Sequence, residues 1–431
     1  MTRSHTLAWA FMLTAVLVFV AANSPSATAY PGSNGRIAFV RDDQGQVTVQ
    51  RIYTMASDGS DVTLVTKGSL PDWSPDGTKL AYSLEGRIWT VSAAGADPRK
   101  VSFRDGDGSS VHLGPTWSPD GSRIAFVNIV NGDFERIWMV NTDGGRLHQV
   151  LDRRATDPAW SPSGRWIAFA GYGIGNDWEI YVMRPNGGGI RALTNIRDPG
   201  PVTEPHVPRD PQWSPDETTV MFTMDGDLWT VPAAGGDPTN LTSTTETAES
   251  EGAWSPDGTR IVATQSPISG GDRDVIVMNT EGTEVTNLTD DDSPQEHFPS
   301  WQPLCTIVGT GGDDEVVGTA GNDVMCGLGG DDSMNGRGGN DVMFGGTGND
   351  HVSGGSGNDI LNGGGGSDTA SGGEGADLLG ATPSSSRDIL LGGDGPDDLE
   401  ARDTFANDRV NGGPQQDTCV AETTDIISNC P

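Results

Sequence analysis

Short runs of apolar and β-branched residues alternate with polar turns along the first three hundred residues. Two kinds of run recur in each unit. The first kind includes 124–127, 166–169 and 220–222, and the second includes 88–91, 137–140, 180–183 and 228–231. Runs this short, separated by Gly, Asn and Asp, predict strands and turns. We therefore expect an all-β fold.

A five-residue marker, Trp-Ser-Pro-Asp-Gly, precedes the first run of each unit. It begins at Trp73, Trp117, Trp160, Trp213 and Trp254, and a decayed copy begins at Trp301. Pro fixes φ and Gly accepts the left-handed conformation, so each marker predicts a turn. The large apolar area of the Trp predicts packing between neighbouring sheets, with stacking on a sugar or a base as the alternative.

Six such modules of about four strands each fit a six-bladed β-propeller. The first module lacks the marker, so we expect His297 to Pro303 to complete it and close the ring. The marker resembles that of the TolB-type, WD40-like propeller family over roughly residues 30 to 303. This resemblance implies the propeller fold and the binding of proteins or peptides at one propeller face.

A second repeat of nine residues begins at Gly309 and runs unbroken through eight copies to Gly380. Its first and fourth positions are Gly, which opens backbone conformations that other residues avoid. Its seventh to ninth positions predict a very short strand with an inward apolar side chain. The sixth position is always Asp: Asp314, Asp323, Asp332, Asp341, Asp350, Asp359, Asp368 and Asp377.

Stacking of like turns would place these carboxylates about 5 Å apart, the spacing of paired strands. Repulsion between neighbours is then about 3 to 4 kcal/mol at an effective dielectric near 20. A thin core of Val, Met and Leu cannot offset that repulsion along a whole column. A hard divalent cation can, and ligation by oxygen alone selects Ca²⁺.

The nine-residue motif resembles the RTX, or haemolysin-type, calcium-binding repeat. The resemblance implies a parallel β-roll with Ca²⁺ between successive turns, ligated by the eight Asp and by backbone carbonyls of the Gly turns. A weaker copy adds Asp397 as a ninth ligand, whereas Asp417 follows a copy that has lost its fourth Gly. The second position departs from Gly at Thr310, Thr319, Leu328 and Arg337, which we expect to be tolerated.

The charge balance supports a cation as partner. The chain has a formal net charge of −34, and the 127 residues from Cys305 to Pro431 hold 22 acidic and four basic residues. Such acidity excludes nucleic acid and anionic lipid as partners. A solvated or disordered acidic tail is the alternative, but it does not account for acids at a fixed interval.

The N-terminus and the cysteines indicate export. Residues 1–29 have the basic start, apolar run and Ala27-Thr28-Ala29 ending of a secretory signal peptide, with a transmembrane anchor as the alternative. The four Cys suggest two local disulfides, Cys305 to Cys326 and Cys419 to Cys430, among three possible connectivities. We therefore expect a secreted protein.

The sequence thus predicts four segments: a signal peptide (1–29), a propeller (30–303), a calcium-binding roll (304–380) and degenerate repeats with a disulfide-bounded cap (381–431). No Gly-x-Ser-x-Gly elbow occurs, and the six His are scattered. We expect a non-enzymatic calcium-binding protein whose propeller binds a protein, peptide or glycan. The alternatives are a secreted hydrolase or lyase with its active site in the propeller channel, and a structural protein that mediates calcium-dependent adhesion.

Overall fold

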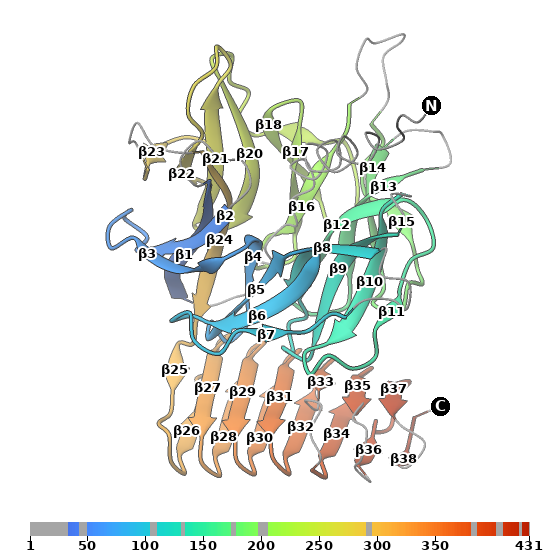
Figure 1. Ribbon diagram of the computed structural model, residues 1–431. Helices are drawn as coiled ribbons and strands as arrows, with labels where there is room; N and C mark the ends of the chain where they lie inside the picture. Colours follow the sequence, from blue (N-terminus) through green and yellow to red (C-terminus); the bar gives the residue numbers. More distant parts are fainter. Residues whose placement is uncertain are drawn as a thin grey trace, which may run out of the picture.

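The structure, a computed structural model, describes residues 33–42, 50–103, 110–130, 134–173, 178–196, 206–289, 295–380, 386–401, 408–421 and 425–430. Within these ranges the regular elements are strands, which form a ring of six four-stranded sheets and a pair of seven-stranded parallel sheets (Figure 1). The expected all-β class, with a six-bladed propeller and a C-terminal parallel β-roll, is confirmed. The expected signal peptide lies outside the described residues. In the part of the chain that is described, no helix is long and apolar enough to cross a membrane.

Each blade of the propeller is an antiparallel sheet of four strands. Blade 1 comprises β24 (Glu296–Leu304), β1 (Ser33–Asp42), β2 (Gln50–Met55) and β3 (Thr63–Lys67). Blade 2 comprises β4 (Ser69–Trp73), β5 (Lys79–Leu84), β6 (Arg87–Ser92) and β7 (Arg99–Lys100). Blade 3 comprises β8 (Ser110–Trp117), β9 (Arg123–Val130), β10 (Arg136–Asn141) and β11 (His148–Gln149).

The remaining three blades repeat the same strand order. Blade 4 comprises β12 (Ala155–Trp160), β13 (Ile167–Tyr172), β14 (Trp178–Met183) and β15 (Arg191–Ala192). Blade 5 comprises β16 (Arg209–Trp213), β17 (Thr219–Met224), β18 (Asp227–Pro232) and β19 (Thr239–Asn240). Blade 6 comprises β20 (Thr247–Trp254), β21 (Arg260–Pro267), β22 (Asp274–Asn279) and β23 (Thr286–Asn287).

The ring closes as the sequence predicts. Strand β24 follows blade 6 in the chain but pairs with β1, so the two ends of the propeller share blade 1. The marker Trp residues are buried between blades. Trp117, for example, packs with Ala81 and Ile88 of blade 2, and Trp301 packs with Val262 of blade 6. The packing role expected for these Trp residues is confirmed.

The Ser-Pro-Asp-Gly segments form tight turns between the first and second strands of the blades. In blade 3 the Ser118 hydroxyl donates to the Asp120 carboxylate, which also accepts the Ser122 backbone N–H at 3.0 Å. Gly121 has a φ of 67°, and Glu217, which replaces Gly in blade 5, has a φ of 56°. The turn therefore keeps its left-handed residue even where Gly is lost.

The roll consists of two parallel sheets whose strands alternate along the chain. The sheet named here the near sheet contains β25 (Ile307–Val308), β27 (Val324–Gly329), β29 (Val342–Thr347), β31 (Ile360–Gly365), β33 (Leu378–Gly380), β35 (Asp398–Ala401) and β37 (Thr418–Ala421). The far sheet contains β26 (Glu315–Val317), β28 (Ser333–Gly338), β30 (His351–Ser356), β32 (Thr369–Glu374), β34 (Ile389–Asp394), β36 (Arg409–Asn411) and β38 (Ile426–Ser428). Both sheets thus continue past Gly380, through the segment predicted as degenerate repeats and cap.

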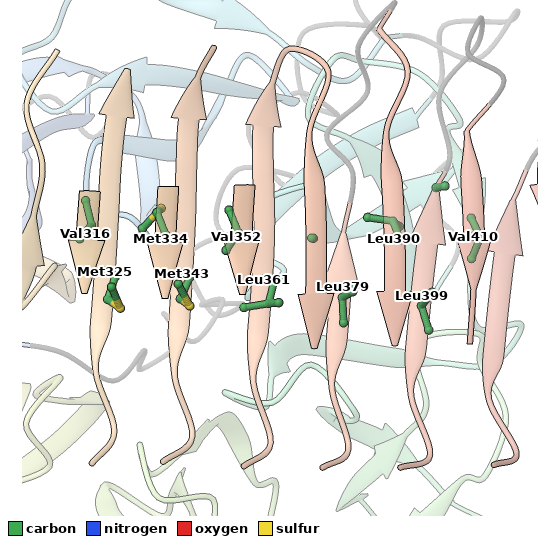
Figure 2. Close-up of a cluster of buried hydrophobic side chains, with 12 residues drawn as sticks. Val316, Met325, Met334, Met343, Val352, Leu361, Leu379, Leu390, Leu399 and Val410 are labelled. Atoms are coloured by element: carbon green, nitrogen blue, oxygen red, sulfur yellow. The ribbon is translucent and has the colours of Figure 1, made fainter. Parts of the chain in front are cut away.

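The core of the roll is one line of apolar side chains between the sheets (Figure 2). They come from the eighth position of each repeat, as expected, and include Met325, Met343 and Leu361 from the near sheet. Most strands are longer than the expected three residues. Pairing resumes after the first Gly of the next repeat, as between Leu328 and Gly346, so β27 and β29 reach six residues.

Both predicted disulfides are present, Cys305–Cys326 and Cys419–Cys430. The first joins the chain between the two bodies to strand β27. The second joins β37 to the C-terminal end of the roll. Each disulfide thus lies at one end of the stack of strands.

The near sheet faces the propeller, and the far sheet faces away (Figure 1). The outward side chains of the near sheet are apolar and buried, among them Val324, Val342 and Ile360. At the same repeat positions the far sheet has Ser333 and His351, both exposed. The difference in sequence between alternate repeats therefore follows from contact with the propeller.

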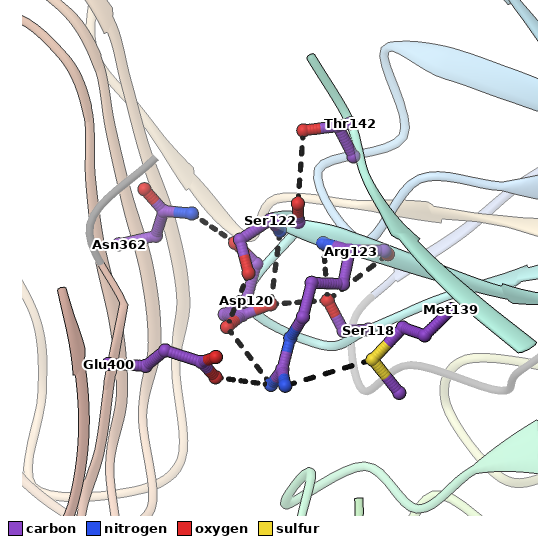
Figure 3. A network of polar contacts seen from close by, with 8 residues as sticks. All are labelled: Ser118, Asp120, Ser122, Arg123, Met139, Thr142, Asn362 and Glu400. Carbon is purple, nitrogen blue, oxygen red and sulfur yellow. Dashed lines mark hydrogen bonds and ion pairs between the residues drawn. The ribbon is translucent and has the colours of Figure 1, made fainter. Parts of the chain in front are cut away.

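Polar contacts join the roll to the turns of blades 3 and 4, and Figure 3 shows those of blade 3. Arg123 Nη2 lies 2.7 Å from Glu400 Oε2, and the Asn362 amide donates to the backbone carbonyl of Asp120. Arg165 Nη2 donates to the carbonyl of Ala376 at 2.6 Å. The roll is thus attached to the propeller face that carries the Ser-Pro-Asp-Gly turns.

This attachment predicts measurable coupling between Arg123 and Glu400. Their side chains are only 11% and 13% exposed, so removing one charge leaves the other desolvated. In a double-mutant cycle with Arg123→Met and Glu400→Gln, we expect a coupling of about 1 to 3 kcal/mol in thermal unfolding. Glu374→Gln, at an exposed acid of the roll, is the control. Coupling below about 0.5 kcal/mol would contradict the interface.

Candidate metal centre

The Asp side chains at the sixth repeat position form two ladders, one along each edge of the roll. In each ladder a carboxylate Oδ1 accepts the backbone N–H of the Asp in the preceding coil, usually 18 residues earlier, at 2.7 to 3.1 Å. The first ladder contains Asp314, Asp332, Asp350, Asp368, Asp388, Asp408 and Asp425. The second contains Asp323, Asp341, Asp359, Asp377, Asp397 and Asp417. Sequence-adjacent repeats therefore lie on opposite edges, and every second repeat stacks.

The other carboxylate oxygen, Oδ2, is buried without a hydrogen-bond donor in most rungs. This holds for Asp332, Asp341, Asp350, Asp359, Asp368, Asp377, Asp397 and Asp417. All eight residues are at most 5% exposed, and Asp341 is fully buried. A buried carboxylate oxygen without a partner is costly, so each position calls for a positive charge or a proton.

Backbone carbonyls surround these oxygens. The space at the glycines is too small for a side chain. If Gly327 had a β-carbon, that atom would lie 2.3 Å from both Asp332 Oδ2 and the carbonyl oxygen of Gly345 in the next coil. One on Gly366 would lie 1.6 Å from the carbonyl oxygen of Gly348. Only Gly permits coils to approach this closely, and the approach brings carbonyl and carboxylate oxygens together.

Burial raises the pKa of the central ladder carboxylates. The pKa rises to about 7 for Asp359 and Asp377, and to about 6 for Asp341 and Asp350. Neighbouring carboxylates add to the rise, as Asp377 and Asp341 do for Asp359. The ladders therefore resist carrying their full negative charge without a counter-ion.

Side chains alone do not make a metal site. Among the described residues, no three His, Cys, Asp or Glu side chains are grouped so that they could hold a metal ion. A cation in the roll would draw most of its ligands from carbonyls, with one or two carboxylates. Oxygen-only ligation of this kind suits Ca²⁺, so the residues fit the ion that the sequence predicts.

Seven of the nine predicted ligands have the buried, donor-free Oδ2: Asp332, Asp341, Asp350, Asp359, Asp368, Asp377 and Asp397. The other two, Asp314 and Asp323, lie in the same ladders, but their Oδ2 atoms accept hydrogen bonds. Asp417, which the sequence left open, is a buried rung of the second ladder.

The sequence prediction missed Asp388, Asp408 and Asp425, which extend the first ladder. Their repeats have lost the Gly pattern, which hid them. A shorter signal survives, because an apolar residue follows each Asp by two positions, as Leu390 follows Asp388 and Val410 follows Asp408. The pattern Asp-x-apolar therefore identifies ladder residues in repeats where the Gly pattern is lost.

The propeller channel offers a second set of acids. The innermost strands of blades 4, 5 and 6 carry Asp157, Asp210 and Glu251, each at a positive φ. Burial raises the pKa of Asp157 to about 6. Its Oδ2 accepts the backbone N–H of Asp210 at 3.4 Å, and Glu251 Oε2 accepts that of Phe298 at 2.8 Å. Asp157 thus joins blade 4 to blade 5, and Glu251 joins blade 6 to blade 1.

Comparison with known proteins assigns both bodies. Residues 28–195 and 88–309 match the TolB beta propeller domain, and residues 308–343 and 344–379 match the RTX calcium-binding nonapeptide repeat. A comparison with curated protein sequences finds no match.

Many solved structures share the propeller fold, and two of them illustrate the likeness. TolB from Acinetobacter baumannii is 21% identical with a TM-score of 0.51, over 62% of this chain and 67% of that one. Kuenenia stuttgartiensis hydrazine synthase is 14% identical with a TM-score of 0.54, over 63% of this chain and 47% of that one. At these identities the likeness is one of fold alone. The family match, by contrast, spans more than half of the chain, so this protein belongs to the TolB beta propeller domain family and carries RTX calcium-binding nonapeptide repeats at its C-terminal end.

Proposed function

We propose that this protein is a secreted calcium-binding protein in which Ca²⁺ orders the roll and the propeller binds a partner. The observation that carries the proposal is the double ladder of buried carboxylates with donor-free Oδ2 atoms. Asp332, Asp350 and Asp368 would hold Ca²⁺ along one edge, and Asp341, Asp359, Asp377 and Asp397 along the other. Carbonyl oxygens of the Gly turns complete the ligand set.

Bound Ca²⁺ would supply the positive charge that the ladders need. Its chemistry here is structural, since it screens neighbouring carboxylates and links stacked turns. Binding to the folded roll alone adds about 2.7 kcal/mol per site at a hundredfold excess over Kd. The roll would consequently gain much of its stability in calcium-rich surroundings, such as the outside of a cell.

The partner would bind the propeller face opposite the roll. The roll occupies the face with the Ser-Pro-Asp-Gly turns, where Arg123 and Arg165 contact it. The propeller family favours a protein or peptide as the partner, with a glycan as the alternative. Secretion is supported by the signal-like residues 1–29 and by the two disulfides.

An enzyme with its active site in the channel is the second candidate. The raised pKa of Asp157 favours it, since catalytic acids are often perturbed in this way. Against it, both Asp157 oxygens accept hydrogen bonds, one from the Thr156 hydroxyl at 2.8 Å and one from the next blade. A partner-binding propeller therefore accounts better for the channel acids.

Calcium should shift the stability of the roll without refolding the propeller. All twelve Trp lie at or before Trp301, so Trp fluorescence reports on the propeller and far-UV circular dichroism on both bodies. We expect added Ca²⁺ to raise the melting temperature of the roll in the full chain and to leave Trp emission nearly unchanged. Mg²⁺ is the control. A roll that melts identically in EDTA and in Ca²⁺ would refute the proposal.

The metal-free roll should be more stable in acid. Burial raises the pKa of Asp359 and Asp377 to about 7, so ionising these carboxyl groups destabilises the folded roll. The destabilisation is absent below about pH 4, where both groups are protonated, and it is complete above about pH 7. In EDTA we expect the roll to lose stability as pH rises from 4 to 7. The double variant Asp359→Asn, Asp377→Asn should flatten this dependence. An unchanged pH profile in that variant would contradict the raised pKa values.

Substitution of one rung should act with opposite signs in the two metal states. Asp359→Asn keeps the Oδ1 acceptor but removes a buried charge, so we expect a more stable metal-free roll. The same change should weaken Ca²⁺ binding about tenfold or more in calorimetry, since a ligand carboxylate is lost. Asp394→Asn, at an exposed acid at the end of strand β34, is the matched control and should do neither. Equal effects of both variants would count against the ladder as the binding site.

A further inference from the structure

The first rung of each ladder differs from the rungs above it. Asp314 Oδ2 accepts the backbone N–H of Thr310 at 2.6 Å and its hydroxyl at 2.7 Å. Asp323 Oδ2 likewise accepts the N–H of Thr319 at 2.6 Å and its hydroxyl at 2.9 Å. Both Thr occupy the second repeat position, where the next two repeats have Leu328 and Arg337 and the last four have Gly. The oxygen that is donor-free in the later rungs is therefore already satisfied here.

The backbone of these first turns also points differently. In later coils, a β-carbon added to the Gly at the fourth repeat position would meet a carbonyl oxygen of the preceding coil on the same edge. A β-carbon on Gly348, for example, would lie 2.0 Å from the carbonyl oxygen of Gly330. A β-carbon on Gly330 would instead meet the carbonyl carbon of Gly312 at 2.3 Å and the nitrogen of Asp313 at 2.5 Å.

The second edge repeats this difference. A β-carbon on Gly357 would lie 1.9 Å from Gly339 O, whereas one on Gly339 would first meet the carbonyl carbon of Gly321, at 2.4 Å. In the first turn of each edge, the peptide group after the fourth Gly thus presents its carbonyl carbon to the next coil. In later turns it presents its carbonyl oxygen. Both kinds of oxygen ligand, carboxylate and carbonyl, are altered together.

We infer that the first gap on each edge is closed by a threonine in place of Ca²⁺. The gaps concerned lie between residues 309–314 and 327–332, and between 318–323 and 336–341. Thr310 and Thr319 cap the ladders, and Ca²⁺ binding begins with Asp332 and Asp341. This inference rests on the proposed function, because it divides the predicted ligands into those that bind Ca²⁺ and two that do not.

Because Thr310 and Thr319 satisfy the first carboxylate of each ladder, the first coil can fold without Ca²⁺. A cation entering the first gap would have to displace two hydrogen bonds from one carboxylate oxygen, and no such cost arises in the later gaps. The Cys305–Cys326 disulfide fixes the chain around the same coil. The first coil therefore offers a formed edge on which later coils stack as Ca²⁺ binds.

Counting bound ions in the full-length chain tests the cap. Isothermal titration with CaCl₂ would compare the wild type with Asp314→Asn, Asp323→Asn and with Asp332→Asn, Asp341→Asn. We expect the first pair of changes to leave the number of bound Ca²⁺ unchanged and to lower the melting temperature in EDTA, because two capped carboxylates are lost. We expect the second pair to lower the number of bound ions.

The reverse change is Thr310→Gly with Thr319→Gly, which restores the consensus and should add up to two Ca²⁺ per chain. If this variant does not fold, the Asn variants decide the question. A loss of ions in Asp314→Asn, Asp323→Asn equal to that in Asp332→Asn, Asp341→Asn would overturn the cap while leaving the proposed function intact. A wild-type chain that binds no Ca²⁺ would overturn the proposed function, and the cap with it.

Discussion

The roll depends on compensating the negative charge of its two Asp ladders. Each carboxylate accepts, through Oδ1, the backbone N–H of the Asp in the preceding coil of its ladder. This hydrogen bond fixes the spacing of the coils. That bond also carries the carboxylate into the interior, where burial raises the pKa of Asp359 and Asp377 to about 7. The bond that orders the stack thus creates the need for a cation or a proton. The apolar core is a single line of side chains and cannot offset this need alone.

Charge compensation in the ladders also affects the contact between the near sheet and the propeller. The outer face of that sheet has a buried apolar cluster that includes Val342 and Ile360. Asn362 on the same face donates to the backbone carbonyl of Asp120 in a propeller turn. Glu400 of the roll pairs with Arg123 of blade 3. Since these contacts come from several coils, they form together only when the coils are stacked. On the proposed account, charge compensation in the ladders therefore also supports the attachment of the roll.

Much of this architecture could be predicted because its determinants are repeated. The marker Trp residues indicated six blades, the position of Trp301 indicated closure by the last strand, and regular Asp spacing indicated a stacked ladder. The alternation between two edges was hidden, since a period of nine assigns the same residue types to both. The outward residues held a signal, Val324 and Val342 in one set of repeats against Ser333 and His351 in the other. Its meaning required knowing which sheet faces the propeller.

Local departures from the repeat were harder to interpret. Asp388 and Asp408 lost the surrounding Gly residues but kept the backbone bond, so a Gly-based pattern could not find them. From the sequence alone, Thr310 and Thr319 are predicted to be tolerated replacements for Gly. In the structure each supplies two donors to a carboxylate, an effect that depends on the fold of the turn and not on residue type alone.

Anomalous diffraction from crystals of the full chain grown with CaCl₂ tests the central claim most directly. If Ca²⁺ compensates the ladders, anomalous peaks will lie between stacked turns along both edges, about 2.4 Å from Oδ2 of rungs such as Asp350 and Asp359. A well-ordered roll without such peaks would show that the ladders are compensated in another way, and would contradict the account.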